Sequence, residues 1–194
     1  MPDPAPASPL LSRLAAHHAD TWRHSLRVGR FAAWLAEAAG LTPQFGPDLA
    51  RAASLHDIGK LALPPALLDK PDALTPAERE RFRCHAGDGA ARLSEAGDSP
   101  LAVAIAGHHH ERWDGSGYPR GLAGTAIPLA ARLVSLVDVY DAIRMPRAYS
   151  PAHAHEEAMT ILHRIAHEFD PTLMAALRAH ADGLEAAYRQ ETGA

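Results

Sequence analysis

Histidine and aspartate recur along this chain at intervals that could bring them to one metal site. Successive groups lie 24 to 32 residues apart, which is about the length of one helix and its connection. In a helical bundle, this spacing sends one polar group from each helix toward a common centre. The candidates are His24, His56, Asp57, His85, His109, His110 and Asp138.

Asp138 is the most diagnostic candidate, because it stands within the apolar run from Leu133 to Val139. An unpaired carboxylate loses its hydration when it is buried, and a metal cation offsets that cost. Imidazole and carboxylate ligands without a thiolate suit Fe, Mn or Zn rather than Ca or Mg. Seven ligands are too many for one ion, so we expect two ions bridged by Asp57. Such a pair is suited to the hydrolysis of a phosphate ester.

The elements that would position these residues are predicted to be helices. His24 shares a helix face with Val28, Phe31 and Leu35, and Gly40 supplies the left-handed cap that ends this helix. His56 and Asp57 are expected on the last turn of a second helix, and Phe82 and His85 together on a third. The third helix is predicted to begin at Thr75-Pro76, and further helices at Ser99-Pro100, at Pro128, around Glu156 to His167 and at Asp170-Pro171. No convincing strand pattern is present, which favours an all-α bundle of about six or seven helices.

Length and composition limit the remaining classes of protein. A chain of 194 residues with 47% hydrophobic content suits a single domain, expected over 10–194, after a Pro-rich disordered segment over 1–9. The formal charge of −4 argues against duplex nucleic acid as a partner. No apolar run approaches the roughly 18 residues that a membrane span requires. The single cysteine, Cys84, fits a reducing compartment, so we expect a cytoplasmic protein.

In their order and spacing, these residues resemble the HD-GYP branch of the HD phosphohydrolase superfamily. The resemblance covers about residues 20–177. Its main pieces are His56-Asp57-Ile58-Gly59-Lys60, the unbroken stretch from His109 to Gly117-Tyr118-Pro119, and Asp138-Val139-Tyr140-Asp141-Ala142. The resemblance implies a helical bundle around two or three divalent ions, Fe or Mn first and Zn as an alternative. It also implies a phosphodiesterase of bacterial signalling that cleaves cyclic di-GMP to pGpG or GMP.

The resemblance assigns roles to individual residues. All seven candidate ligands match the family's metal ligands. His108 is the one histidine of the His108–His110 triplet that has no such match. The resemblance makes Asp57 and Lys60 the catalytic residues. Lys60 corresponds to a cation at the scissile phosphate, Gly117 and Tyr118 to the pocket mouth beside a guanine, and Arg147 to an arginine that contacts the ligand. Asp20 stands one helical turn before His24, where members with three metals have a carboxylate. Asp141 is expected to support a ligand or to lie on a helix surface.

Two departures from the family pattern keep other functions open. Ser150 stands where family members more often have Lys or Arg, and Arg23 replaces a glycine before the first histidine. One alternative is a catalytically weak domain that senses a nucleotide, or that docks a diguanylate cyclase through the turn at Gly117 to Pro119. The other alternative is a hydrolase of another cyclic dinucleotide or of a nucleotide monophosphate.

Overall fold

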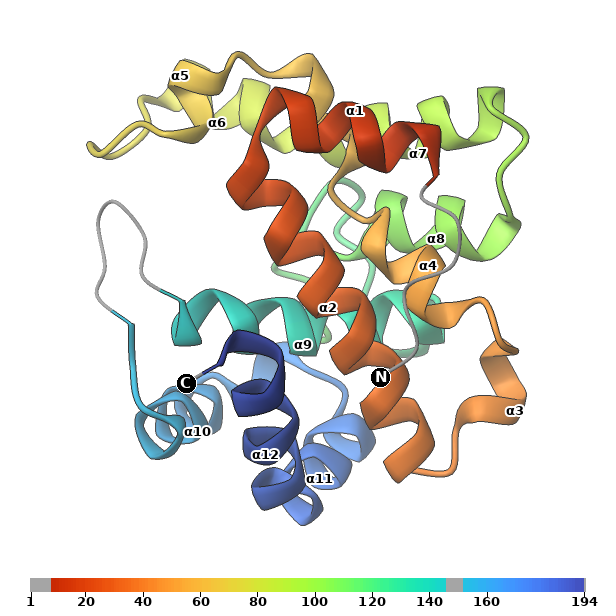
Figure 1. The fold of residues 1–194 in the computed structure, drawn as a ribbon, viewed down its shortest axis with the longest axis vertical. Helices are drawn as coiled ribbons and strands as arrows, with labels where there is room; N and C mark the ends of the chain where they lie inside the picture. The colour runs from red at the N-terminus through yellow and green to blue at the C-terminus, as the bar shows by residue number, and fades with distance from the viewer. Residues whose placement is uncertain (1–7, 146–151, 194) are drawn as a thin grey trace.

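Helices account for the regular secondary structure of the described residues, 8–145 and 152–193, in this computed structural model (Figure 1). The predicted all-α class is confirmed, but the described chain is divided into more helices than the six or seven expected. The α-helices are Pro9–His17 (α1), Ala19–Ala38 (α2), Thr42–Phe45 (α3), Leu49–Ser54 (α4), Pro65–Leu68 (α5), Pro76–Arg83 (α6), His85–Glu95 (α7), Pro100–His108 (α8), Leu129–Arg144 (α9), His155–Arg164 (α10), Pro171–Ala179 (α11) and Ala181–Thr192 (α12). Short 3₁₀ helices are Ile58–Ala62 (η1), Gly124–Ala126 (η2) and Ala166–Glu168 (η3).

Two of the additional breaks fall at candidate ligands. α4 ends at Ser54 and η1 begins at Ile58, so His56 and Asp57 lie in the turn between them and not on the last turn of a helix. α6 and α7 are separate helices, so Phe82 and His85 do not share one. Gly59 explains how closely these pieces pack, since a Cβ there would lie 1.9 Å from the His85 carbonyl oxygen. The fold therefore brings η1 directly against the start of α7.

The capping signals in the sequence place the helix ends correctly. Thr75 and Glu78 form a reciprocal capping box at the start of α6. The side chains of Ser99 and Asp170 accept backbone hydrogen bonds at the starts of α8 and α11. Gly40 follows α2 with φ of +68°, the left-handed conformation expected of it.

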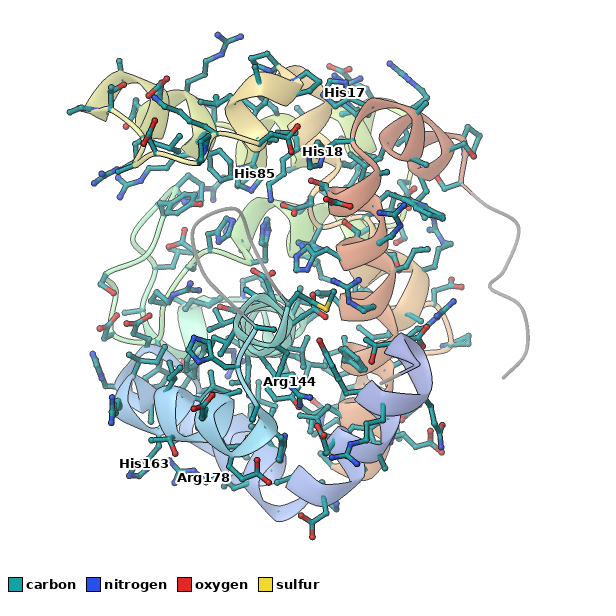
Figure 2. All side chains as sticks on the ribbon, turned by 60° about the vertical axis from the view of Figure 1, so that its left-hand side comes forward. His17, His18, His85, Arg144, His163 and Arg178 are labelled. Carbon is teal, nitrogen blue, oxygen red and sulfur yellow. The ribbon has the colours of Figure 1, made fainter. Side chains whose placement is uncertain are left out.

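The long helices α2 and α9 cross at the centre of the molecule (Figure 1). α2 packs against α1, α4, α9 and α12, whereas α7 packs against α8 and η1. Val28, Phe31 and Leu35 on α2 are almost completely buried in one core with Leu133 and Val137 on α9. Figure 2 shows His85 on one side of α9 and Arg144 on the other, beside the C-terminal helices. The candidate ligands come from the elements on the His85 side and from the facing residues of α2 and α9.

The first described helix begins close to the expected start of the domain. α1 begins at Pro9, the last residue of the segment expected to be disordered, and residues 1–7 lie outside the described residues. Leu11 and Leu14 of α1 are buried in the core. Among the residues that the structure describes, no helix combines the length and apolar character needed to cross a bilayer.

Candidate metal centre

The seven candidate ligands meet in one place. Nitrogen and oxygen atoms of six of them form two groups, each with all ligand atoms within 4.8 Å of one another. The His24 group contains His24, His56 and Asp57, and the His85 group contains Asp57, His85, His109 and His110. Asp138 lies beside the His24 group, with its Oδ1 atom 2.9 Å from His24 Nε2 and 3.9 Å from His56 Nε2.

Asp57 belongs to both groups, and its two carboxylate oxygens face different histidines. Oδ1 lies 3.4 Å from His85 Nε2 and 3.7 Å from His109 Nε2. Oδ2 lies 3.5 Å from His56 Nε2 and 4.0 Å from His24 Nε2. A carboxylate placed in this way can bind one ion with each oxygen, which is the bridging arrangement expected from the sequence.

Backbone carbonyls orient three of the histidines. In each case Nδ1 donates a hydrogen bond to the carbonyl of a residue three positions earlier, and a carbonyl can only accept. The Nε2 atom is then left without a proton in the neutral ring and faces the other ligands. The Nδ1-to-oxygen distances are 2.9 Å from His56 to Ala53, 2.5 Å from His85 to Phe82 and 3.0 Å from His109 to Ala106.

Several of the inward-facing atoms have no hydrogen-bond partner in the protein. His56 Nε2, His109 Nε2 and Asp57 Oδ1 are all buried and unpaired. Each such atom costs roughly 1–3 kcal/mol when its hydration is lost without replacement. Because all three carry lone pairs toward the same space, a divalent cation satisfies them together. The residues present therefore fit a metal centre.

The charge states of the His85 group also suit a cation. Burial lowers the pKa of His85 to about 3, and it lowers the pKa values of His109 and His110 as well. For Asp57, burial opposes ionisation, but Lys60 and His56 outweigh it and hold the pKa of the carboxyl well below its usual range. Neutral imidazoles and ionised carboxylates are the forms that bind metal ions.

His24 is held differently from the other histidines. Its Nδ1 atom lies 2.6 Å from Asp141 Oδ2, and Asp141 also accepts hydrogen bonds of 2.8 and 2.9 Å from Arg27. Burial lowers the pKa of His24, but the hydrogen bonds to Asp138 and Asp141 outweigh it and raise the pKa to about 9. Asp141 is completely buried and contacts His24 at Nδ1, whereas Nε2 of the same ring faces Asp138. The structure thus favours a supporting role for Asp141 and excludes the helix-surface position.

Lys60 and Tyr118 lie beside the two groups. The Nζ atom of Lys60 is 2.5 Å from Asp57 Oδ2 and 5.2 Å from the centre of the Phe82 ring. The Tyr118 ring stacks on His110 with 4.7 Å between ring centroids, and the Arg83 guanidinium lies 5.1 Å from the Tyr118 ring centroid. Lys60 therefore lies at the Asp57 carboxylate that both groups share, and the Tyr118 ring packs against a candidate ligand.

Gly117 has a packing role that the sequence did not indicate. The Gly117 φ angle is not in the positive region, so the backbone conformation alone does not require glycine here. A Cβ at this position would instead lie 2.4 Å from Arg112 N and 2.5 Å from the His110 carbonyl oxygen. Tyr118 N donates to that same carbonyl at 3.1 Å. The turn is therefore pressed against His110, so Gly117 and Tyr118 are half-buried and Pro119 is exposed.

This packing predicts a large effect of Gly117→Ala. Overpacking against backbone atoms typically costs about 1–3 kcal/mol, and we expect the variant to lose stability by at least that amount and to displace His110. Thermal and denaturant unfolding measure the loss. Gly87→Ala is the matched control, because its Cβ would meet nothing within 4 Å. Equal stability of the two variants would contradict the packing role of Gly117.

Glu111 is a structural residue of the site that the sequence analysis missed. It is buried next to the candidate ligands His109 and His110, and its carboxylate accepts hydrogen bonds from Arg120 N at 2.8 Å and Leu122 N at 3.0 Å. It thereby anchors the chain that follows the Gly117 turn. Glu111 stands in a charged, Gly-rich stretch of the sequence, where an acid on the protein surface would look the same.

The remaining predicted site residues are not brought into the two groups. Asp20 is 79% exposed and pairs with Arg23 at 2.6 Å, so the structure does not direct it toward the centre. Arg23 is 59% exposed and does not crowd the site. His108 lies outside both groups. Arg147 and Ser150 fall outside the described residues.

Comparisons with known proteins agree with this geometry. The family model described as HD domain matches residues 9–173. A cyclic di-GMP phosphodiesterase of Vibrio cholerae is 40% identical over 176 residues, which cover 82% of this chain and 36% of that protein. A 3'3'-cGAMP-specific phosphodiesterase 2 of the same organism is 33% identical, with coverage of 89% of this chain and 34% of that protein. The chain therefore spans only about a third of the length of these relatives.

A solved structure supports the fold. An HDG"Y"P protein from Bdellovibrio bacteriovorus superposes with a TM-score of 0.69 at 23% identity, over 90% of this chain and 56% of that one. At this identity the likeness concerns the fold alone. The family model, in contrast, extends over most of the sequence and includes all seven candidate ligands. The chain belongs to the HD domain family.

Proposed function

We propose that this chain is a metal-dependent phosphodiesterase of the HD-GYP type that hydrolyses cyclic di-GMP to pGpG, GMP or both. The observation that carries the proposal is the placement of Asp57, whose two oxygens face the two groups of histidines. The similarity to a cyclic di-GMP phosphodiesterase of Vibrio cholerae supports the choice of substrate.

The proposed centre would hold two divalent ions. His24, His56, Asp57 and Asp138 would bind one, and Asp57, His85, His109 and His110 would bind the other. When bound, such ions supply Lewis acidity toward a phosphoryl group and a nucleophile at neutral pH. Imidazole and carboxylate ligands favour Fe or Mn, with Zn as an alternative. A third ion at Asp20 stays a prediction, and the exposed Asp20 side chain does not favour it.

The protein's own residues hold and orient the scissile phosphate. Lys60 is a point charge beside the bridging carboxylate, and we assign it to a non-bridging oxygen, where it stabilises charge that grows in the transition state. Tyr118 and Gly117 lie at His110 and are assigned to the edge of the pocket that receives a guanine. The low exposure of the ligands keeps water away from these contacts and strengthens them.

A second candidate substrate is another cyclic dinucleotide. It is favoured by the 33% identity to a 3'3'-cGAMP-specific phosphodiesterase, which covers 89% of this chain. The same centre serves both substrates, because each presents a phosphodiester to the ions. Docking of a diguanylate cyclase at Gly117 to Pro119 remains a prediction. A cytoplasmic location also remains a prediction, and the free thiol of Cys84 supports it.

The experiment that tests the proposal is a hydrolysis assay with a substrate panel. Protein purified without oxygen and loaded with Fe²⁺ or Mn²⁺ is incubated with cyclic di-GMP, 3'3'-cGAMP and cyclic di-AMP, and products are separated by chromatography. We expect pGpG or GMP from cyclic di-GMP, and none after chelation of the metal. Loaded protein that binds a dinucleotide but cleaves none of the panel would be a sensor and not an enzyme.

A further inference from the structure

We propose that Asp141, clamped by Arg27, is a positioning residue that fixes the His24 ring for metal binding and so makes the two metal positions unequal. The inference deepens the proposed function and rests on it. The position at the His24 group depends on a buried charged partner, whereas the position at the His85 group does not. Asp141 touches His24 and Arg27 and is not itself a ligand in this assignment.

The proposal starts from a difference among the histidines. The Nδ1 atoms of His56, His85 and His109 bind neutral backbone carbonyls within their own segments. His24 Nδ1 instead binds the Asp141 carboxylate, 117 residues away in the sequence. A carboxylate partner makes the imidazole a stronger electron donor than a carbonyl does, and it fixes which nitrogen faces the ion.

The contact is built by matching turns of two helices. His24 and Arg27 are three residues apart on α2, and Asp138 and Asp141 are three residues apart on α9, so each pair lies on one helix face. His24 meets both acids, at 2.9 Å from Asp138 and 2.6 Å from Asp141. The α2–α9 contact therefore places one acid at each ring nitrogen of His24, with Asp138 at Nε2 and Asp141 at Nδ1.

Arg27 stabilises the buried Asp141 carboxylate. Asp141 has no solvent exposure, and a buried carboxylate without a partner is strongly destabilising. Arg27 donates to both oxygens of Asp141, from Nε at 2.8 Å and from Nη2 at 2.9 Å. This two-point geometry holds the carboxylate plane in one orientation, which a single ammonium donor cannot do.

A purely structural salt bridge is the competing explanation, and the chain offers a matched control for it. Asp170 is also buried, at 4% exposure, and it accepts a hydrogen bond of 2.5 Å from Arg132. It caps α11 and belongs to neither ligand group. Asp141→Asn and Asp170→Asn therefore remove the same charge from the same kind of pair, but only the first is expected to alter metal binding.

The test is a titration of the metal-free full chain with Mn²⁺, in which electron paramagnetic resonance measures the free ion. Wild-type protein is expected to bind two ions. Asp141→Asn is expected to weaken one of the two by about 10- to 100-fold and to leave the other unchanged, and Asp170→Asn to leave both unchanged. Unchanged binding in Asp141→Asn, or an equal loss at both positions, would overturn the inference.

Arg27→Lys keeps the test decisive if Asp141→Asn does not fold. Lysine retains the positive charge but loses the two-point clamp, so the same single position is expected to weaken, by a smaller factor. Two unaltered affinities in Arg27→Lys would then reject the positioning role. Failure of the wild-type chain to bind any Mn²⁺ or Fe²⁺ would be a different result, because it would remove the metal centre of the proposed function itself.

Discussion

Asp57→Asn is expected to abolish the hydrolysis of cyclic di-GMP while the fold is retained. Asparagine keeps the size of the side chain but removes the charge that both ligand groups share, and only one of its atoms remains a good metal ligand. Two-metal centres supply several kcal/mol of transition-state stabilisation, so kcat should fall by about 10³-fold or more. The measurement is product formation at saturating metal, together with metal content per chain.

Asp88→Asn is the control for this variant. Asp88 lies on α7, the helix that begins with His85, but its side chain is exposed and outside both ligand groups. The control should keep full activity and metal content. An Asp57→Asn protein that retains two ions and its activity would remove the bridging role on which the proposed mechanism depends.

Lys60→Met is expected to reduce kcat by about 10²- to 10³-fold without loss of metal, because it removes a charge at the phosphate and no ligand. Methionine has nearly the length of lysine and is uncharged, so it removes the ammonium that lies 5.2 Å from the centre of the Phe82 ring. The effect should be on kcat more than on KM, since the charge acts most strongly on the transition state.

The chain provides an ideal comparison for this lysine. Lys70 is the only other lysine in the sequence, and it binds Glu78 at the start of α6. Lys70→Met should leave the kinetic constants unchanged. If Lys60→Met were as active as Lys70→Met, Lys60 would be a structural partner of Asp57 and not a catalytic group.

The clustering of the candidate ligands could be predicted from the sequence because its signal is one of residue type and spacing. Asp138 in an apolar run and His85 one helix length from Asp57 both indicate a shared centre, and the helix caps at Thr75, Ser99 and Asp170 are local features. These properties are residue types, spacings and local patterns along the chain. They can therefore be read from one sequence without a structure.

The supporting residues could not be predicted in the same way. The sequence left two places open for Asp141, beside a ligand or on a helix surface, and only the crossing of α2 and α9 brings it to His24 and Arg27. Glu111 is defined by two backbone amides of a loop that follows it. The need for glycine at 117 arises from the His110 carbonyl and not from its own φ angle. Such roles come from tertiary approach, which the local pattern does not contain.

The most direct test of the shared metal centre is a crystal structure of the Fe- or Mn-loaded protein with anomalous scattering measured at the absorption edge of that metal. Two peaks are predicted, one beside His24 and His56 and one beside His85, His109 and His110, with an oxygen of Asp57 bound to each. A single peak, or peaks that Asp57 does not join, would contradict the account.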